Sequence, residues 1–147
     1  MSSGINTPSN GPRVKAFFYG SFIRKDVQAK SGFVPQKIEV AHLNGFDIRI
    51  CPHAALSHSD RHTVYGILVD ITHRQLDAMY SAPGVGVFLP QAVLVKTVDD
   101  KVVPALCYIP PSYGDEPADR DYLEKLIVAG REHGFPEWYL AYLRAMP

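Results

Sequence analysis

The chain has 147 residues, of which 46% are hydrophobic, and these values predict a single domain with a packed core. Fifteen basic residues balance fifteen acidic ones, so the chain lacks the positive charge typical of nucleic-acid binders. No apolar run approaches the roughly 20 residues that cross a bilayer, and the first residues have no signal-peptide core, so we expect a cytoplasmic protein without a membrane or nucleic-acid partner.

The N-terminal residues predict a tail followed by a buried strand. Residues 1–13 are rich in Ser, Asn, Gly and Pro and predict a flexible tail, so that the single domain covers residues 14–147. The apolar run 14–19 is closed by Gly20 and is typical of a buried strand.

The next segments predict a hairpin, a loop and a second buried strand. Residues 38–50 alternate between apolar and polar types around Asn44-Gly45, the dipeptide favoured in type I′ turns, and therefore predict a β-hairpin. The polar residues 51–62 predict an exposed loop, and the apolar run 63–71 predicts a strand.

A helix and a further pair of strands are predicted next. Thr72 and Gln75 match a capping box that opens a helix, which must end near Ser81 because a proline and a glycine follow. Residues 87–98 and 102–109 are β-rich and are joined by a short polar segment, so they predict a second hairpin.

Two helices are predicted at the C-terminal end. Asp119 is expected to cap a helix that runs through His133 and stops at Gly134, and Pro136 suits the first turn of a final aromatic helix. Because strands and helices are mixed and the hairpins are antiparallel, we predict an α+β fold with a curved or barrel-like sheet.

The cysteines and histidines favour no metal site or disulfide framework. Cys51 and Cys107 lie in apolar, strand-like contexts and are interpreted as buried, inert thiols. His53, His58 and His62 lie in the polar loop, but their spacing fits no common zinc pattern, so solvated histidines are expected there.

The end of the first strand is a candidate binding segment. Phe17 to Phe22 leaves that strand through Tyr19-Gly20-Ser21, where a glycine allows the backbone to approach a ligand. Consecutive amides in such a turn can hold a carboxylate. A strand end without a functional role is the alternative interpretation.

Three features of the chain together resemble one known family. Tyr19-Gly20-Ser21 after a first strand, the run VYGILVDI and a capped helix with Leu76-Asp77 are similar to the γ-glutamylcyclotransferase-like family, also called AIG2-like, over residues 14–145. The resemblance implies a small, mixed, mostly antiparallel six-stranded β-barrel flanked by helices. It also implies release of 5-oxoproline from γ-glutamyl amines or peptides without a cofactor. The implied pocket would hold the glutamyl α-carboxylate on backbone amides and is expected to include Tyr19, Gly20, Ser21, Phe22, Phe88 and Tyr108.

One position departs from the family pattern. Members use a glutamate as general base at the end of the helix after the VYG strand, and this chain has Tyr80 there. A phenol with a pKa of about 10 is a poor base at neutral pH. Asp77 lies three residues earlier and can share the same helix face, so it is a substitute candidate. Tyr80 and Asp77 are therefore the predicted catalytic residues.

Three functions are compatible with these patterns. The first is an enzyme that acts on a small γ-glutamyl amine or peptide, or on a related acyl-amine substrate in the same pocket. The second is a non-catalytic protein that binds a small carboxylate or amine. The third is a partner-binding domain, which the aromatic C-terminal segment with Phe135, Trp138, Tyr139 and Tyr142 would serve as an exposed patch.

Overall fold

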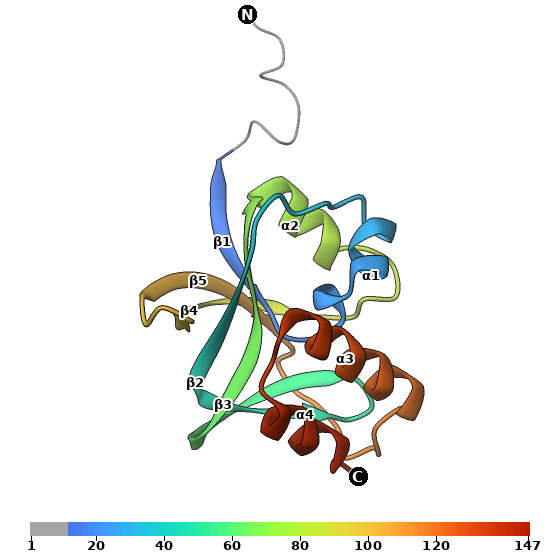
Figure 1. Cartoon of the computed structure of the whole chain (residues 1–147). Helices are drawn as coiled ribbons and strands as arrows, with labels where there is room; N and C mark the ends of the chain where they lie inside the picture. The colour runs from blue at the N-terminus through green and yellow to red at the C-terminus, as the bar shows by residue number, and fades with distance from the viewer. Residues whose placement is uncertain (1–11) are drawn as a thin grey trace, which may run out of the picture.

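The computed structural model of the chain describes residues 12–147, which form five strands, four α-helices and one 3-10 turn (Figure 1). Residues 1–11 of the expected tail lie outside the described residues, and the first strand begins at Arg13, one residue before the expected domain start. In chain order the elements are β1 (Arg13–Phe18), η3 (Ser21–Ile23), α1 (Lys25–Lys30), β2 (Ile38–Ile50), β3 (Ala54–Thr72), α2 (His73–Tyr80), β4 (Leu89–Thr97), β5 (Val102–Ile109), α3 (Arg120–His133) and α4 (Glu137–Arg144).

The strands form one mixed, mostly antiparallel sheet. Their order is β1-β3-β2-β4-β5, and every neighbouring pair in this order is antiparallel. The last strand returns to the first through one parallel bridge between Ala16 and Leu106, so the sheet curls back on itself. The α+β class is confirmed, but the expected sixth strand is not found among residues 12–147.

The hairpin predicted within residues 38–50 is wrong, and this explains the missing strand. These residues form the single strand β2, and Asn44-Gly45 makes an irregularity in its pairing with β3 instead of a turn. Gly45 has a φ of 89°, which is the left-handed conformation that glycine adopts in many bulges. The long-range partner β3 thus overrides a local turn signal.

The exposed loop predicted for residues 51–62 is also wrong. The chain turns back at Cys51-Pro52-His53, and β3 then pairs with β2 from Ala54 onwards. Polar side chains are tolerated there because one face of an antiparallel pair can face water. Figure 1 shows the paired strands bending near their middle, so that their distal part runs beside α3 and α4. This bend carries the β2–β3 turn toward the end of β1.

The predicted helix boundaries are confirmed by the capping contacts. Thr72 accepts a hydrogen bond from the backbone N–H of Gln75, and the Gln75 side chain accepts one from the backbone of Thr72, as a capping box requires. Asp119 caps α3, and Gly134 ends it with a φ of 86°. Pro136 is the residue before α4, one position earlier than expected. No helix in the described part of the chain is long and apolar enough to span a bilayer.

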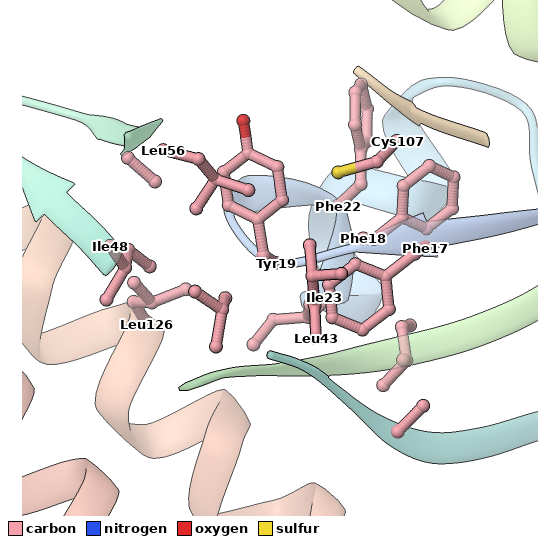
Figure 2. Packing of buried hydrophobic residues seen from close by; sticks show 14 of the residues in the cluster. Phe17, Phe18, Tyr19, Phe22, Ile23, Leu43, Ile48, Leu56, Cys107 and Leu126 are labelled. Atoms are coloured by element: carbon pink, nitrogen blue, oxygen red, sulfur yellow. The ribbon is translucent and has the colours of Figure 1, made fainter. Parts of the chain in front are cut away.

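The hydrophobic core lies between the curled sheet and the helices. Figure 2 shows side chains from β1, β2, β3, β5 and α3 meeting in this core, among them Phe17, Leu43 and Leu126. Cys107 is buried there as predicted, whereas Cys51 is only half-buried because it lies in the β2–β3 turn.

The C-terminal aromatic residues cover one surface of the sheet. The rings of Phe135, Trp138 and Tyr139 lie within 6.0 Å of the Tyr65 ring on β3. Phe135 and Tyr139 are buried, while 58% of Trp138 is exposed. Most of the segment therefore contributes to packing.

Candidate functional site

A cavity of about 460 Å³ opens where the end of β1 meets the β2–β3 turn. Its wall consists of residues 18–22, side chains of α1, the turn residues His53 and Ala54, residues 80–88 in part, and Tyr122 of α3. These segments are far apart in sequence, and the bend in β2 and β3 brings the turn into the wall. The predicted residues Tyr19, Gly20, Ser21, Phe22, Tyr80 and Phe88 all line this cavity.

Two backbone amides in the described wall, those of Gly20 and Phe22, have no backbone acceptor. The carbonyls of Gly20 and Ser21 accept the N–H groups of Ile23 and Arg24, which forms the 3-10 turn η3. The Ser21 N–H faces the Tyr122 hydroxyl oxygen, whereas the N–H groups of Gly20 and Phe22 have no backbone acceptor among residues 12–147, as expected where a helical turn begins. Free amides in such a turn favour an anion.

Gly20 makes a close approach that a larger residue would prevent. A Cβ atom at this position would lie 3.0 Å from the Cβ of Ala54 and 3.3 Å from the Tyr122 hydroxyl oxygen. Carbon atoms in good contact are separated by about 3.5–4.0 Å. A larger residue would therefore press against β3 and α3, because the loop touches both.

Tyr122 joins the loop to the β2–β3 turn. Its hydroxyl oxygen accepts the backbone N–H of Ala54 at 3.2 Å and lies 3.4 Å from Ser21 Oγ. Burial raises the pKa of Tyr122, although its hydrogen bonds act in the opposite direction. The hydroxyl is consequently protonated at neutral pH and remains a hydrogen-bond donor.

Tyr80 belongs to an aromatic wall on another side of the cavity. Its ring stacks on Tyr108 with a centroid separation of 4.1 Å and an interplanar angle of 6°. The rings of Phe18, Phe22 and Phe88 lie 5.1–6.4 Å from it. Burial among these rings raises the pKa of Tyr80 well above its usual value. Its hydroxyl can donate a hydrogen bond but cannot accept a proton at neutral pH.

Two predicted site residues lie outside the cavity wall. Asp77 is exposed on α2, and its charge adds to burial in raising the pKa of Tyr108. Tyr108 supports the wall from behind, because its ring stacks on Tyr80 and its carbonyl accepts the Tyr19 hydroxyl at 2.8 Å. Burial raises the pKa of Tyr19 strongly, so this hydroxyl is a permanent donor.

No negatively charged side chain lines the cavity in the described part of the chain. Arg24, Lys30 and His53 are in the wall, and no aspartate or glutamate of residues 12–147 is. Arg24 is held by Asp26 through two hydrogen bonds of 3.1 and 2.5 Å, which lower the pKa of that carboxyl. The cavity therefore suits an anionic ligand.

The histidines predicted as loop residues have separate environments. His53 lies in the cavity wall, His58 packs on Phe46, and His62 contacts Ser59 Oγ at 2.5 Å. Within the described chain no three His, Cys, Asp or Glu side chains gather as a metal site would require.

Sequence reasoning missed Arg24, His53 and Tyr122 as wall residues. Tyr122 lies in the first turn of α3, and His53 falls in the segment that the sequence predicts as a solvated loop. No local signal marks either residue, because both reach the cavity only through the bend of β2 and β3. The capping residue Asp119 predicts where α3 begins, but the sequence does not predict which residues the start of α3 contacts.

Comparison with solved structures identifies the fold. No protein-family profile matches the chain, and no curated protein matches its sequence. Among solved structures, a γ-glutamyl cyclotransferase superposes with a TM-score of 0.79 at 20% identity, covering 92% of this chain and 89% of that one. An uncharacterised protein from Homo sapiens gives 0.78 at 20% identity, covering 92% and 88%. An AIG2-like protein from Mus musculus gives 0.54 at 15% identity, covering 71% and 87%. The chain thus has the γ-glutamylcyclotransferase-like fold.

Proposed function

We propose that the cavity binds a small γ-glutamyl amine or peptide and that the chain releases 5-oxoproline from it. The observation that carries this proposal is the pair of unpaired amides of Gly20 and Phe22 in a cavity whose described lining has no negative side chain. The fold shared with a γ-glutamyl cyclotransferase supports the choice of ligand.

The amides and cations would hold the α-carboxylate of the ligand. A carboxylate on these N–H groups makes charge-assisted hydrogen bonds, which are stronger than neutral ones. The aromatic wall around Tyr80 would pack against the methylene groups of the glutamyl chain. Holding the carboxylate and packing the methylene groups in this way would restrict the chain to shapes in which the α-amine is close to the γ-carbonyl.

Cyclisation requires orientation and proton transfer. The α-amine attacks the γ-carbonyl carbon, a five-membered lactam forms, and the amine on the far side of the carbonyl leaves. Holding the two reacting groups in one geometry supplies much of the rate enhancement in intramolecular reactions. The proposal needs no cofactor, because the nucleophile and the leaving group belong to the same ligand.

Product analysis and calorimetry test the proposal. γ-Glutamylalanine should bind and release 5-oxoproline, measured by mass spectrometry. Its α-carboxamide analogue should bind at least tenfold more weakly, because it has no charge for the amides. β-Aspartylalanine, which is one methylene shorter, is the control that cannot form the five-membered lactam. Absence of binding by both γ-glutamylalanine and 5-oxoproline would contradict the proposal.

A non-catalytic carboxylate-binding protein is the second candidate. It is favoured by the protonated hydroxyl of Tyr80 at the position where the resembled family uses a glutamate. Tight binding of 5-oxoproline or γ-glutamylalanine without any product would support this candidate. Product from another acyl-amine substrate, with none from γ-glutamyl compounds, would indicate divergent chemistry in the same cavity.

A further inference from the structure

The β2–β3 turn places an imidazole in the wall of the cavity that contains the unpaired amides. His53 follows the turn residues Cys51 and Pro52 and precedes Ala54, the residue that the Gly20 backbone approaches. Its ring lies 4.6 Å from the ring of Tyr122, measured between centroids. His53 is thus on the side of the cavity that contacts the Gly20 loop, and it is separate from the wall built around Tyr80.

A carboxylate accompanies this imidazole. Asp119 Oδ2 lies 4.0 Å from Nε2 of His53, while Oδ1 accepts the backbone N–H of Tyr122 at 3.2 Å. The backbone N–H of Asp119 donates to the carbonyl of Pro52 at 3.2 Å, which ties the start of α3 to the turn. The carboxylate is therefore held near the ring by contacts on both sides.

The other side chains of the cavity cannot take a proton from an amine at neutral pH. Tyr19, Tyr80 and Tyr122 are protonated phenols, and Arg24 and Lys30 are cations. Histidine is the residue type that gains and loses a proton near neutral pH. In a ligand whose α-carboxylate binds the Gly20 and Phe22 amides, the α-amine is on the adjoining carbon, in the same cavity that His53 lines.

We propose that His53, positioned by Asp119, accepts the proton of the ligand's α-ammonium group and passes it to the leaving amine. This inference rests on the proposed function. The ammonium first gives one proton to the imidazole, and the nitrogen lone pair then forms the bond to the γ-carbonyl carbon. In the tetrahedral intermediate His53 gives this proton to the nitrogen of the leaving amine. The neutral imidazole then takes the second proton from the attacking nitrogen and passes it to the same amine. The bond to the leaving amine breaks with its electron pair on that amine, which departs as an ammonium ion carrying both protons.

The exposed position of His53 suits such an exchange. Its side chain is 63% exposed, so the ring can reach the cavity and can also exchange a proton with water. The charged or titratable side chains next to His53 are Asp119 and Tyr122 of α3. Arg24 and Lys30 line the same cavity.

The test compares His53→Gln with His58→Gln in 5-oxoproline release from γ-glutamylalanine between pH 5.5 and 9. His58 is a matched control, because it is an exposed histidine near the same hairpin that packs on an aromatic ring outside the cavity. The wild type should lose rate on the acid side as the imidazole becomes protonated. His53→Gln should lower kcat by about 10²–10⁴-fold and abolish this acid limb, with the Kd for 5-oxoproline changed little. His58→Gln should match the wild type.

Asp119→Asn provides a readout that a purely structural role would not change. Asparagine is as good a helix cap as aspartate, so thermal stability should be kept. Loss of the carboxylate that positions the ring should lower kcat, with the Kd for 5-oxoproline changed little.

The outcomes separate this inference from the proposed function. Product formation by folded His53→Gln with the wild-type rate and acid limb would overturn the role of His53 and leave the proposed function standing. Binding without any product in the wild type would overturn the proposed reaction and the role of His53 together.

Discussion

Replacing Gly20 by alanine tests the contact that closes the cavity wall. The new Cβ would lie 3.0 Å from the Cβ of Ala54, about 0.5–1 Å closer than carbon atoms in good contact. Overpacking of this kind typically costs about 1–3 kcal/mol. At about 2–4 °C per kcal/mol, the Tm should fall by roughly 2–12 °C.

A double-mutant cycle assigns the loss to this contact. Ala54→Gly removes the atom that the new Cβ would meet, so Gly20→Ala combined with Ala54→Gly should be more stable than the sum of the single effects predicts. Coupling energies between residues in contact are about 0.5–3 kcal/mol. Chemical denaturation of the four proteins measures this energy. Single effects that simply add would refute the close approach of the Gly20 loop to β3.

The same four proteins can be titrated with 5-oxoproline. Gly20→Ala should weaken binding by about tenfold or more, because a loop shift of even 1 Å misplaces the amides that would hold the carboxylate. The double variant should recover part of that loss. Gly114→Ala is the control, since the nearest atom to its Cβ is the Glu116 carboxylate oxygen, at the end of a flexible side chain.

Three further predictions follow from the described contacts. Tyr80→Glu places a carboxylate where the resembled family has its base, so 5-oxoproline release should rise at least tenfold, equivalent to about 1.4 kcal/mol of barrier; an unchanged or lower rate in a folded variant would count against a base at this position. In the folded protein, a thiol reagent at pH 8 should label Cys51 before Cys107, because burial raises the pKa of Cys107 to about 12; equal labelling rates would contradict its burial. The Tyr142 hydroxyl donates to Asp47 at 2.7 Å, and burial together with this carboxylate raises the pKa of Tyr142 to about 12. Between pH 10 and 12 the unfolded phenol therefore releases its proton while the folded one keeps it, so the free energy of unfolding should fall with rising pH, and less steeply in Tyr142→Phe.

Local signals predicted the elements that depend on local contacts. The Thr72–Gln75 capping box, the Asp119 cap and the Gly134 stop involve residues at most four positions from a helix end, so the sequence is sufficient to place them. The strands β4 and β5 are close in sequence and pair along their length, and they were also found.

The errors arose where a distant partner decides the structure. Asn44-Gly45 has the composition of a tight turn, yet β3 pairs with β2 on both sides of it and holds the strand extended. The polar residues after Ala54 form a strand for the same reason. No window of sequence around Gly45 contains the information that β3 is long enough to pair with all of β2.

Some residues of the candidate site could likewise be predicted from local sequence, and others depend on distant contacts. The Tyr19–Phe22 segment and Tyr80 were identified from motif order, and both line the cavity. Tyr122 and His53 come from the start of a helix and from a turn, and only the bend of the β2–β3 pair brings them to the loop. Because the sequence predicts a turn at Asn44-Gly45, it does not predict the bent β2–β3 pair that contributes one wall of the cavity.

The charges in the cavity affect the ligand's two ionic groups in opposite ways. A γ-glutamyl ligand carries a carboxylate and an ammonium group on the same carbon, and the described residues that line the cavity include Arg24 and Lys30 but no aspartate or glutamate. Neighbouring positive charge stabilises the carboxylate and disfavours the ammonium form, which lowers the pKa of the α-amine. The free amine is the form that attacks a carbonyl carbon, so this charge distribution makes deprotonation easier and reduces the strength of base that is needed. An imidazole then suffices as the base. The missing glutamate is therefore compatible with cyclisation under the proposed function, provided that the amine binds on the His53 side.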